Sequence, residues 1–259
     1  MSAAFIESGS GDTALFLLHG VGGGKDAWPG QMEAFAKAGY RVIAPDGPGY
    51  GGSPTISPYT LAGVAQELGS LIDRIGAKRN VIIGHSMGGM VAQEAYAAYP
   101  QKIHGLVLSG TSPAFGKPDG DWQKEFLAKR LAPLDAGKTM PELAPGLVAG
   151  MLGPNPEPAG KQLAIEVMAR VPAATYRAAL QALVSFDRRA LLATITVLTL
   201  VLSAEHDGNA PAVVMERMAA KIPGSEYVCL PGLGHLACME NPAVFNAAVL
   251  GFLGRHFPG

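Results

Sequence analysis

Cysteine, charge and long apolar runs are all scarce in this sequence. Its two cysteines, Cys229 and Cys238, are too few for a disulfide framework in 259 residues, and we expect both to be reduced thiols. Residues 1–11 hold neither a basic region nor an apolar stretch, so we expect no signal peptide and a cytoplasmic protein. No apolar run approaches the roughly 20 residues that a membrane-spanning helix needs, so no membrane partner is expected.

The charge balance excludes polyanionic partners. The formal net charge is −1, so nothing attracts the chain to nucleic acid or to an anionic membrane surface. Hydrophobic residues make up 48% of the chain and charged residues only 16%, which indicates a well-filled core rather than disorder. A length of 259 residues suits one α/β domain that carries an insertion.

Short apolar runs alternate with helical periodicity through most of the chain. Strands are predicted at residues 3–7, 13–19, 40–45, 81–83, 103–109, 196–203 and 225–230. Helices are predicted at residues 28–38, 60–75, 91–99, 211–222 and 242–256. A glycine- and serine-rich turn joins runs 3–7 and 13–19, which are expected to form a hairpin. The alternation predicts an α/β fold, with a mostly parallel sheet flanked by helices.

The alternation of strand and helix patterns stops between residues 111 and 192. Strand patterns are missing there, and proline and glycine cluster, as at residues 152–158. Helices are expected at residues 121–131, 141–151, 159–170 and 173–186. We therefore predict an α/β core formed by residues 1–110 and 193–259, with an all-helical insertion, residues 111–192, before the last two strands.

The most informative motif is Gly84-His85-Ser86-Met87-Gly88, a G-x-S-x-G. It stands between a strand-like run and a helical segment, where this pattern is typical of a nucleophile elbow that lifts a serine above a sheet. The two glycines leave room for a strained serine backbone. A glycine-rich turn without chemistry is the alternative, but the flanking strand and helix favour Ser86 as a nucleophile.

A serine nucleophile needs a base, and the base needs a group that orients it. In a parallel α/β sheet, catalytic groups collect at the carboxyl ends of the strands. His235 follows the last strand-like run and Asp207 follows the one before it, which gives the order Ser, Asp, His expected with this motif. Glu205 shares the loop of Asp207 and is the alternative carboxylate. His19 and His85 are expected to shape loops rather than to act as bases.

Acyl transfer also requires hydrogen-bond donors for an oxyanion. The backbone amide of Met87, directly after the serine, is the first predicted donor. The second is the amide of Val21, in the glycine-rich loop that follows a buried strand-like run. That loop is not a phosphate-binding loop, because Lys25 is followed by Asp26 rather than by serine or threonine.

These residues together resemble the α/β-hydrolase superfamily, over nearly the whole chain outside the insertion. The resemblance rests on His19-Gly20, on D-G-P-G-Y-G-G-S at residues 46–53, on the elbow around Ser86, on Asp207 and on Gly234-His235. It implies that residues 111–192 form a helical cap over the active site.

A narrower similarity links the chain to the 3-oxoadipate enol-lactonase and aryl-esterase group. It rests on G-G-M-V-A-Q at residues 88–93, on His235-Leu236 and on E-N-P at residues 240–242. His85 stands where those lactonases often carry leucine, so the resemblance implies a carboxylesterase in the general sense. Serine rather than aspartate as the nucleophile argues against a haloalkane dehalogenase.

The expected activity is hydrolysis of a small carboxylic ester or an (enol-)lactone through an acyl-enzyme, without a metal or other cofactor. Ser86, His235 and Asp207 form the expected triad. Hydrolysis of a carbon–carbon bond in a ring-cleavage product, perhydrolysis of a bound carboxylic acid and non-catalytic ligand binding are the alternatives. A monomer or a homodimer is expected.

Apolar residues are expected to line the substrate pocket. Trp122, Phe126 and Met151 of the insertion, with Leu236 beside the catalytic histidine, are the predicted substrate-binding residues. Basic residues of the insertion are expected to be solvated, and binding of a substrate carboxylate by one of them is the alternative. They are Lys124, Lys129, Arg130, Arg170, Arg177, Arg188 and Arg189.

Overall fold

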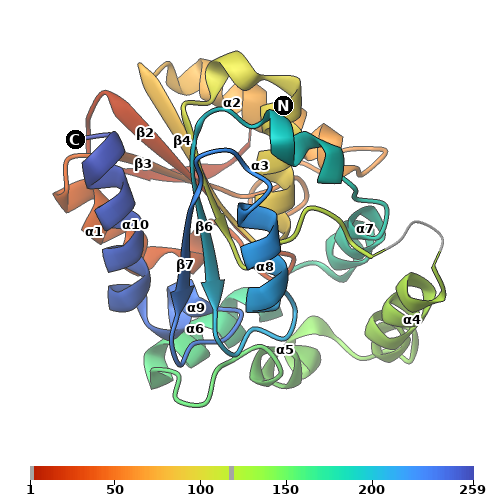
Figure 1. Cartoon of the computed structure of the whole chain (residues 1–259). Coiled ribbons are helices and arrows are strands. Elements are labelled where there is room, and N and C mark those ends of the chain that lie inside the picture. The colour runs from red at the N-terminus through yellow and green to blue at the C-terminus, as the bar shows by residue number, and fades with distance from the viewer. Residues whose placement is uncertain (1–2, 117–119) are drawn as a thin grey trace.

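The computed structural model describes residues 3–116 and 120–259, and a seven-stranded sheet forms the centre of this part of the chain (Figure 1). The strands are β1 (Phe5–Ser8), β2 (Thr13–Leu18), β3 (Arg41–Pro45), β4 (Arg79–His85), β5 (Gly105–Ser109), β6 (Leu198–Ala204) and β7 (Glu226–Leu230). Their order across the sheet is β1-β3-β2-β4-β5-β6-β7, in which β1 runs antiparallel to β3 and all other neighbours are parallel. The α/β fold with a mostly parallel sheet is confirmed.

The predicted hairpin of the first two strands is wrong. β1 pairs with β3 instead, with Phe5 opposite Pro45, and β2 lies between β3 and β4. Every residue of β2 is buried, whereas β1 is only half-buried. A fully buried strand needs a neighbour on both edges to pair its backbone groups, so β2 takes the inner position and β1 the edge.

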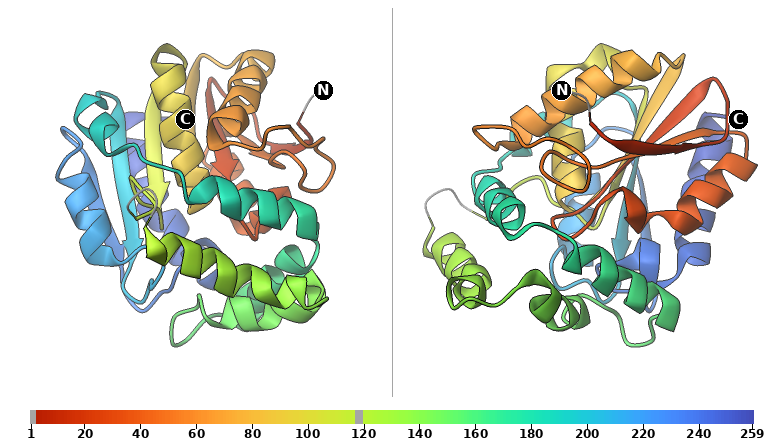
Figure 2. Two further views of the ribbon diagram at one scale, coloured as in Figure 1. Left: turned by 90° about the vertical axis from the view of Figure 1, so that its right-hand side faces the viewer. Right: turned by 180° about the vertical axis from the view of Figure 1, so that it is seen from behind.

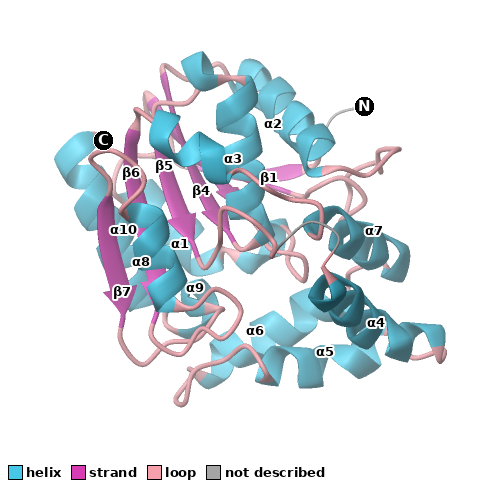
Figure 3. Cartoon of the chain, turned by 45° about the vertical axis from the view of Figure 1, so that its right-hand side comes forward, coloured by secondary structure: helices cyan, strands magenta, loops and turns pink. Residues whose placement is uncertain are grey.

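Helices cover both faces of the sheet. On one face lie α1 (Pro29–Lys37) and α10 (Pro242–His256), and on the other lie α2 (Leu61–Ile75), α3 (Met87–Ala98) and α8 (Ala212–Ala219) (Figures 1 and 3). Apolar residues of α2 recur three and four positions apart and are buried, as the sequence pattern predicts. Short helical turns connect the layers: η1 (Lys25–Ala27), η2 (Pro100–Lys102) and α9 (Ala237–Glu240).

Between β5 and β6 the described residues form helices joined by loops, and one isolated bridge links Ala114 to Asp187. The helices are α4 (Asp121–Asp135), α5 (Met140–Ala149), α6 (Pro158–Ala169), α7 (Ala173–Leu183) and η3 (Arg189–Thr194). The arrowheads of β6 and β7 point toward α5 and α6 in Figure 1, and Figure 2 shows these helices gathered at one end of the molecule. Helices α5 and α6 of the insertion therefore lie at the carboxyl ends of the strands.

Four helix boundaries differ from the predicted ones by three or more residues, at the start of α3 and at the ends of α4, α7 and α8. The helices predicted to end at residues 186 and 222 end at Leu183 and Ala219. The helix expected from residue 91 begins at Met87, because Gly88 and Gly89 are poor helix formers and conceal its first turn in the sequence. The helix expected to end at residue 131 continues through Pro133 to Asp135.

None of the helices formed by residues 3–116 and 120–259 has the length and hydropathy needed to cross a membrane.

Candidate active site

Ser86 is the single residue between the end of β4 and the start of α3. Its φ of 55° makes it the one non-glycine residue with positive φ in the described part of the chain. Such a conformation costs on the order of 1–3 kcal/mol and persists only where the surroundings enforce it. A Cβ atom on Gly84 would lie 2.4 Å from the carbonyl oxygen of Gly88, and one on Gly88 would lie 2.1 Å from that of Leu18. The glycines of the motif are therefore required by backbone packing.

The structure brings three of the predicted residues into one hydrogen-bonded line. His235 Nδ1 donates to Asp207 Oδ2 at 2.8 Å, and His235 Nε2 lies 3.0 Å from Ser86 Oγ. Because Nδ1 carries the proton that the carboxylate accepts, Nε2 is free to accept the hydroxyl proton of Ser86. Both His235 and Asp207 are buried, so bulk water does not screen the pair.

Asp207, rather than Glu205, lies beside the histidine. Burial raises the pKa of the Asp207 carboxyl, but the hydrogen bonds from His235 and from the amides of Ala210 and Asn209 outweigh burial and hold that pKa below its ordinary value. Glu205 is exposed and accepts instead from the amide of Gly232. Asp207 is thus the ionised carboxylate that supports the imidazole.

Glu240 fixes the loop that carries His235, and sequence reasoning assigned it no such role. This carboxylate is 1% exposed and accepts from the amides of Leu236 at 3.0 Å, Gly234 at 3.0 Å and Gly153 at 2.7 Å. No cation neutralises it among the described residues, so backbone amides alone stabilise its charge. The spacing of Glu240 five residues after His235 was the available signal, but a sequence does not reveal that a glutamate is buried.

The loop after β2 lies against the serine. A Cβ atom on Gly20 would lie 3.1 Å from Ser86 Cβ and 3.5 Å from Ser86 Oγ. The amides of Val21 and Met87, the predicted oxyanion donors, make no hydrogen bond to any residue that the structure describes. The carbonyl oxygen of Val21 accepts from the Tyr50 hydroxyl at 2.9 Å, which holds the loop in place.

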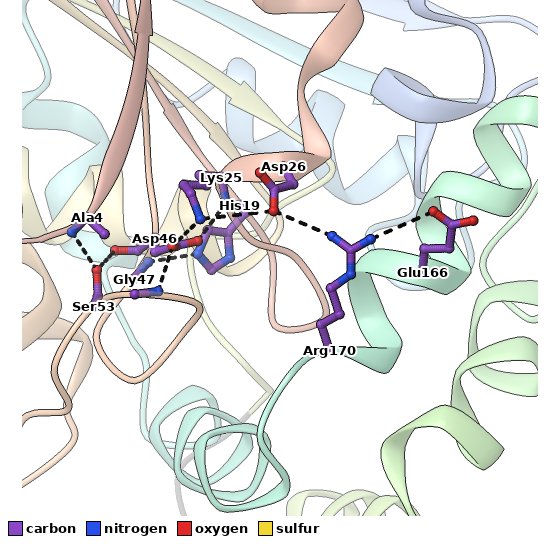
Figure 4. A network of polar contacts seen from close by, with 10 residues as sticks. Ala4, His19, Lys25, Asp26, Asp46, Gly47, Ser53, Glu166 and Arg170 are labelled. Carbon is purple, nitrogen blue, oxygen red and sulfur yellow. Dashed lines mark hydrogen bonds and ion pairs between the residues drawn. The ribbon is translucent and has the colours of Figure 1, made fainter.

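A network of polar contacts around His19 and Asp46 supports the loop that follows β2 (Figure 4). His19 Nδ1 donates to the carbonyl oxygen of Gly20 at 2.8 Å, and His19 Nε2 accepts from the amide of Gly47 at 2.9 Å. Burial lowers the pKa of His19, so its ring is neutral and can accept that bond. Both nitrogens are used for loop geometry, as expected from the sequence.

Asp46 completes this network. Its carboxylate accepts from the amide and the ammonium of Lys25, each at 2.9 Å, and from the amide of Gly52 at 3.1 Å. Burial raises the pKa of Asp46, but these donors outweigh burial and keep the carboxyl ionised. Asp26, next to Lys25, lies 3.6 Å from Arg170 of the insertion (Figure 4).

His85 packs beside His235, with 4.9 Å between the ring centroids. Burial, with a smaller contribution from the His235 charge, lowers the pKa of His85 to about 3. His85 is therefore neutral near pH 7 and adds no positive charge next to His235.

A cavity of about 620 Å³ opens above Ser86. Its wall includes Ser86, His235 and all four predicted substrate-binding residues: Trp122, Phe126, Met151 and Leu236. The sequence did not identify other residues of the wall, because helical periodicity does not distinguish a residue that lines a cavity from one that is buried in the hydrophobic core. These residues are Trp28, Tyr176, Leu180, Leu183 and Met239. Over residues 3–116 and 120–259, no cluster of histidine, cysteine, aspartate and glutamate side chains is arranged to hold a metal ion.

The model of the Alpha/beta hydrolase family matches residues 15–248. The chain belongs to this family. RutD of Variovorax paradoxus, a proposed carbamate hydrolase, is 33% identical to this hydrolase in an alignment of 252 positions that covers 93% of this chain and 92% of RutD. The 2-hydroxy-6-oxononadienedioate/2-hydroxy-6-oxononatrienedioate hydrolase of a Pseudomonas species is 30% identical over 96% of this chain and 90% of its own.

Solved structures agree with the family assignment. A thermophilic esterase from Thermogutta terrifontis, solved with malate bound, superposes on this hydrolase with a TM-score of 0.87. It is 28% identical, over 98% of this chain and 94% of the esterase. The sequence-based resemblance to the α/β-hydrolase superfamily is therefore confirmed, and the protein is a hydrolase of this fold.

Proposed function

We propose that this hydrolase cleaves small carboxylic esters or lactones through an acyl-enzyme on Ser86. The observation that carries the proposal is the line of hydrogen bonds from Asp207 through His235 to Ser86, at 2.8 and 3.0 Å, at the bottom of a mostly apolar cavity. The similarity to a solved esterase supports the same class of reaction.

In the proposed mechanism, Ser86 Oγ attacks the ester carbonyl while His235 Nε2 accepts its proton. Asp207 stabilises the imidazolium that forms. The amides of Val21 and Met87 donate to the oxyanion, in a position made accessible by Gly20. His235 then returns the proton to the leaving alcohol, and water activated by His235 hydrolyses the acyl-enzyme.

We propose further that residues 111–192 act as a cap domain over a core of residues 1–110 and 193–259. Support comes from the cavity wall, to which the core contributes Ser86 and His235 and the insertion contributes Phe126 and Met151. Choice of substrate then depends on the insertion, and the chemical step depends on the core.

Hydrolysis of p-nitrophenyl acetate and butyrate by wild type and by Ser86→Ala tests the proposal. Loss of the nucleophile is expected to lower kcat by a factor of about 1000 or more, with an unchanged circular dichroism spectrum. Equal turnover by both proteins would exclude the mechanism.

Hydrolysis of a carbon–carbon bond is the second candidate, because the Pseudomonas relative carries the name of a dienedioate hydrolase. The same serine and histidine would serve that reaction. A vinylogous diketone acid offered beside p-nitrophenyl butyrate separates the two: a higher kcat/KM for the diketone favours carbon–carbon cleavage, and a higher value for the ester favours the esterase.

A further inference from the structure

The arginines of the insertion fall into two groups. Arg177 pairs with Asp135 at 2.6 Å, Arg188 makes two bonds to Glu94, Arg189 pairs with Asp187, and Arg170 lies 3.6 Å from Asp26 and 3.9 Å from Glu166. Arg130 is the exception, since none of the described carboxylates lies within 4.0 Å of it. Arg130 is also the one arginine that lines the cavity above Ser86.

The Arg130 guanidinium is held in place without a counter-ion among residues 3–116 and 120–259. It lies over the ring of Phe126, 5.6 Å from the ring centroid, in a cation–π contact. Burial raises the pKa of the Tyr176 hydroxyl, and the hydrogen bond and charge of Arg130 partly offset that rise. Phe126 and Tyr176 line the cavity too, so two aromatic groups orient this cation at its wall.

The charges around Arg130 leave the cavity wall positive. The face of α4 that lines the cavity carries Glu125, Lys129 and Arg130. In the described part of the chain, no carboxylate lies within ion-pair distance of Lys129, and no cation lies within ion-pair distance of Glu125. The cavity also contains His19 and His85, whose pKa values burial lowers, so these rings add no charge. Two cations face one anion on this wall.

We infer that the substrate carries a carboxylate, which Arg130 binds with Lys129 while the scissile carbonyl lies at Ser86. A guanidinium offers two parallel N–H donors that match a carboxylate, and an arginine that pairs with none of the described carboxylates is available to an anionic ligand. The inference rests on the proposed ester hydrolysis and narrows it to monoesters or lactones that retain a free acid group. Glu125 would repel a second anion at this position, so one carboxylate is expected here.

Binding to the inert Ser86→Ala variant tests the carboxylate site without turnover. Monomethyl adipate and dimethyl adipate differ by one negative charge, and isothermal titration calorimetry compares their affinities. The monoester is expected to bind at least ~10-fold more tightly. Adding Arg130→Gln should abolish the preference, and adding Arg130→Lys should keep part of it. Adding Lys124→Gln, the same charge change on the same helix but outside the cavity wall, should leave the preference intact.

Equal affinity for the two adipates, or a preference that survives Arg130→Gln, would overturn the carboxylate site. A preference that Lys124→Gln removes equally would overturn it too, because the effect would then be one of general charge. Failure of the proposed ester hydrolysis would be seen in a separate measurement: wild type would then cleave p-nitrophenyl butyrate no faster than Ser86→Ala. The calorimetric result decides the carboxylate site in either case.

Discussion

The backbone amide of His235 donates a 2.7 Å hydrogen bond to the carbonyl oxygen of Met151, which connects the histidine of the candidate site to the wall of the cavity. The two backbone segments approach closely here: a Cβ atom on Gly234 would lie 2.6 Å from the Met151 oxygen and 2.3 Å from the Gly153 nitrogen. Glu240 bonds both Gly153 and Gly234. The insertion and His235 are therefore positioned by one set of contacts.

Glu240→Gln tests this coupling. A carboxamide loses one of the two acceptor oxygens and gains a donor facing amides, so stability should fall by on the order of 2 kcal/mol. Displacement of His235 should lower kcat for p-nitrophenyl butyrate roughly 10- to 100-fold. Urea denaturation and steady-state kinetics measure the two effects. Glu226→Gln, which alters a surface carboxylate paired with Arg255 and His256, should keep the wild-type kcat.

Tyr50→Phe tests the position of the oxyanion loop. The change removes the hydroxyl that donates to the Val21 carbonyl oxygen and leaves the ring in its buried site. We expect kcat to fall about 3- to 10-fold with little change in KM, because in the proposed mechanism the amide of Val21 stabilises the transition state. Tyr227→Phe removes a hydroxyl bonded to Ser203, outside the cavity wall, and should have wild-type kinetics. An equal loss of kcat in both variants would contradict the assigned role of Val21.

His85 makes stability depend on pH. Its folded pKa, about 3, lies below the ordinary value of 6.5, so the unfolded chain binds the proton more readily between these values. The contribution of His85 to stability is complete above pH 6.5 and is lost as pH falls toward 3, at about 1.4 kcal/mol per pH unit. His85→Gln should have a shallower decline in the free energy of unfolding between pH 6 and pH 4, measured with urea. Identical slopes for the two proteins would exclude this contribution.

Two glycine substitutions should change stability in opposite directions. Gly88→Ala places a methyl group 2.1 Å from the Leu18 carbonyl oxygen and should destabilise the elbow by several kcal/mol, on the order of 4 or more. Gly146 lies within α5, and a methyl group added there would meet no heavy atom within 4 Å, so Gly146→Ala should stabilise by up to about 1 kcal/mol. Thermal unfolding distinguishes them, and an unchanged melting temperature for Gly88→Ala would contradict the packing described for the motif.

The sequence was sufficient for features that depend on local pattern. The buried strands and the G-x-S-x-G motif predicted the sheet and the place of Ser86, and the order of strand ends predicted that Asp207 and His235 would approach it. The choice between Asp207 and Glu205 required the three-dimensional structure, because both stand on one loop and only the path of that loop decides which reaches His235.

Features that depend on contacts between distant segments were not predictable. β1 pairs with β3 at the edge of the sheet, because β2 is already paired on both sides, with β3 and with β4. The buried state of Glu240 depends on Gly153, 87 residues away along the chain. The lack of a described carboxylate beside Arg130 depends on where those carboxylates lie in the fold, and no local sequence pattern predicts that arrangement.

Covalent labelling of Ser86 tests the central claim most directly. A fluorophosphonate probe reacts with a serine that an adjacent base activates, and mass spectrometry of the intact and digested protein locates the adduct. Wild type should gain one adduct, on Ser86, Ser86→Ala should gain none, and His235→Gln should react about 1000-fold more slowly. A folded wild-type protein without an adduct on Ser86, or undiminished labelling of His235→Gln, would contradict the account.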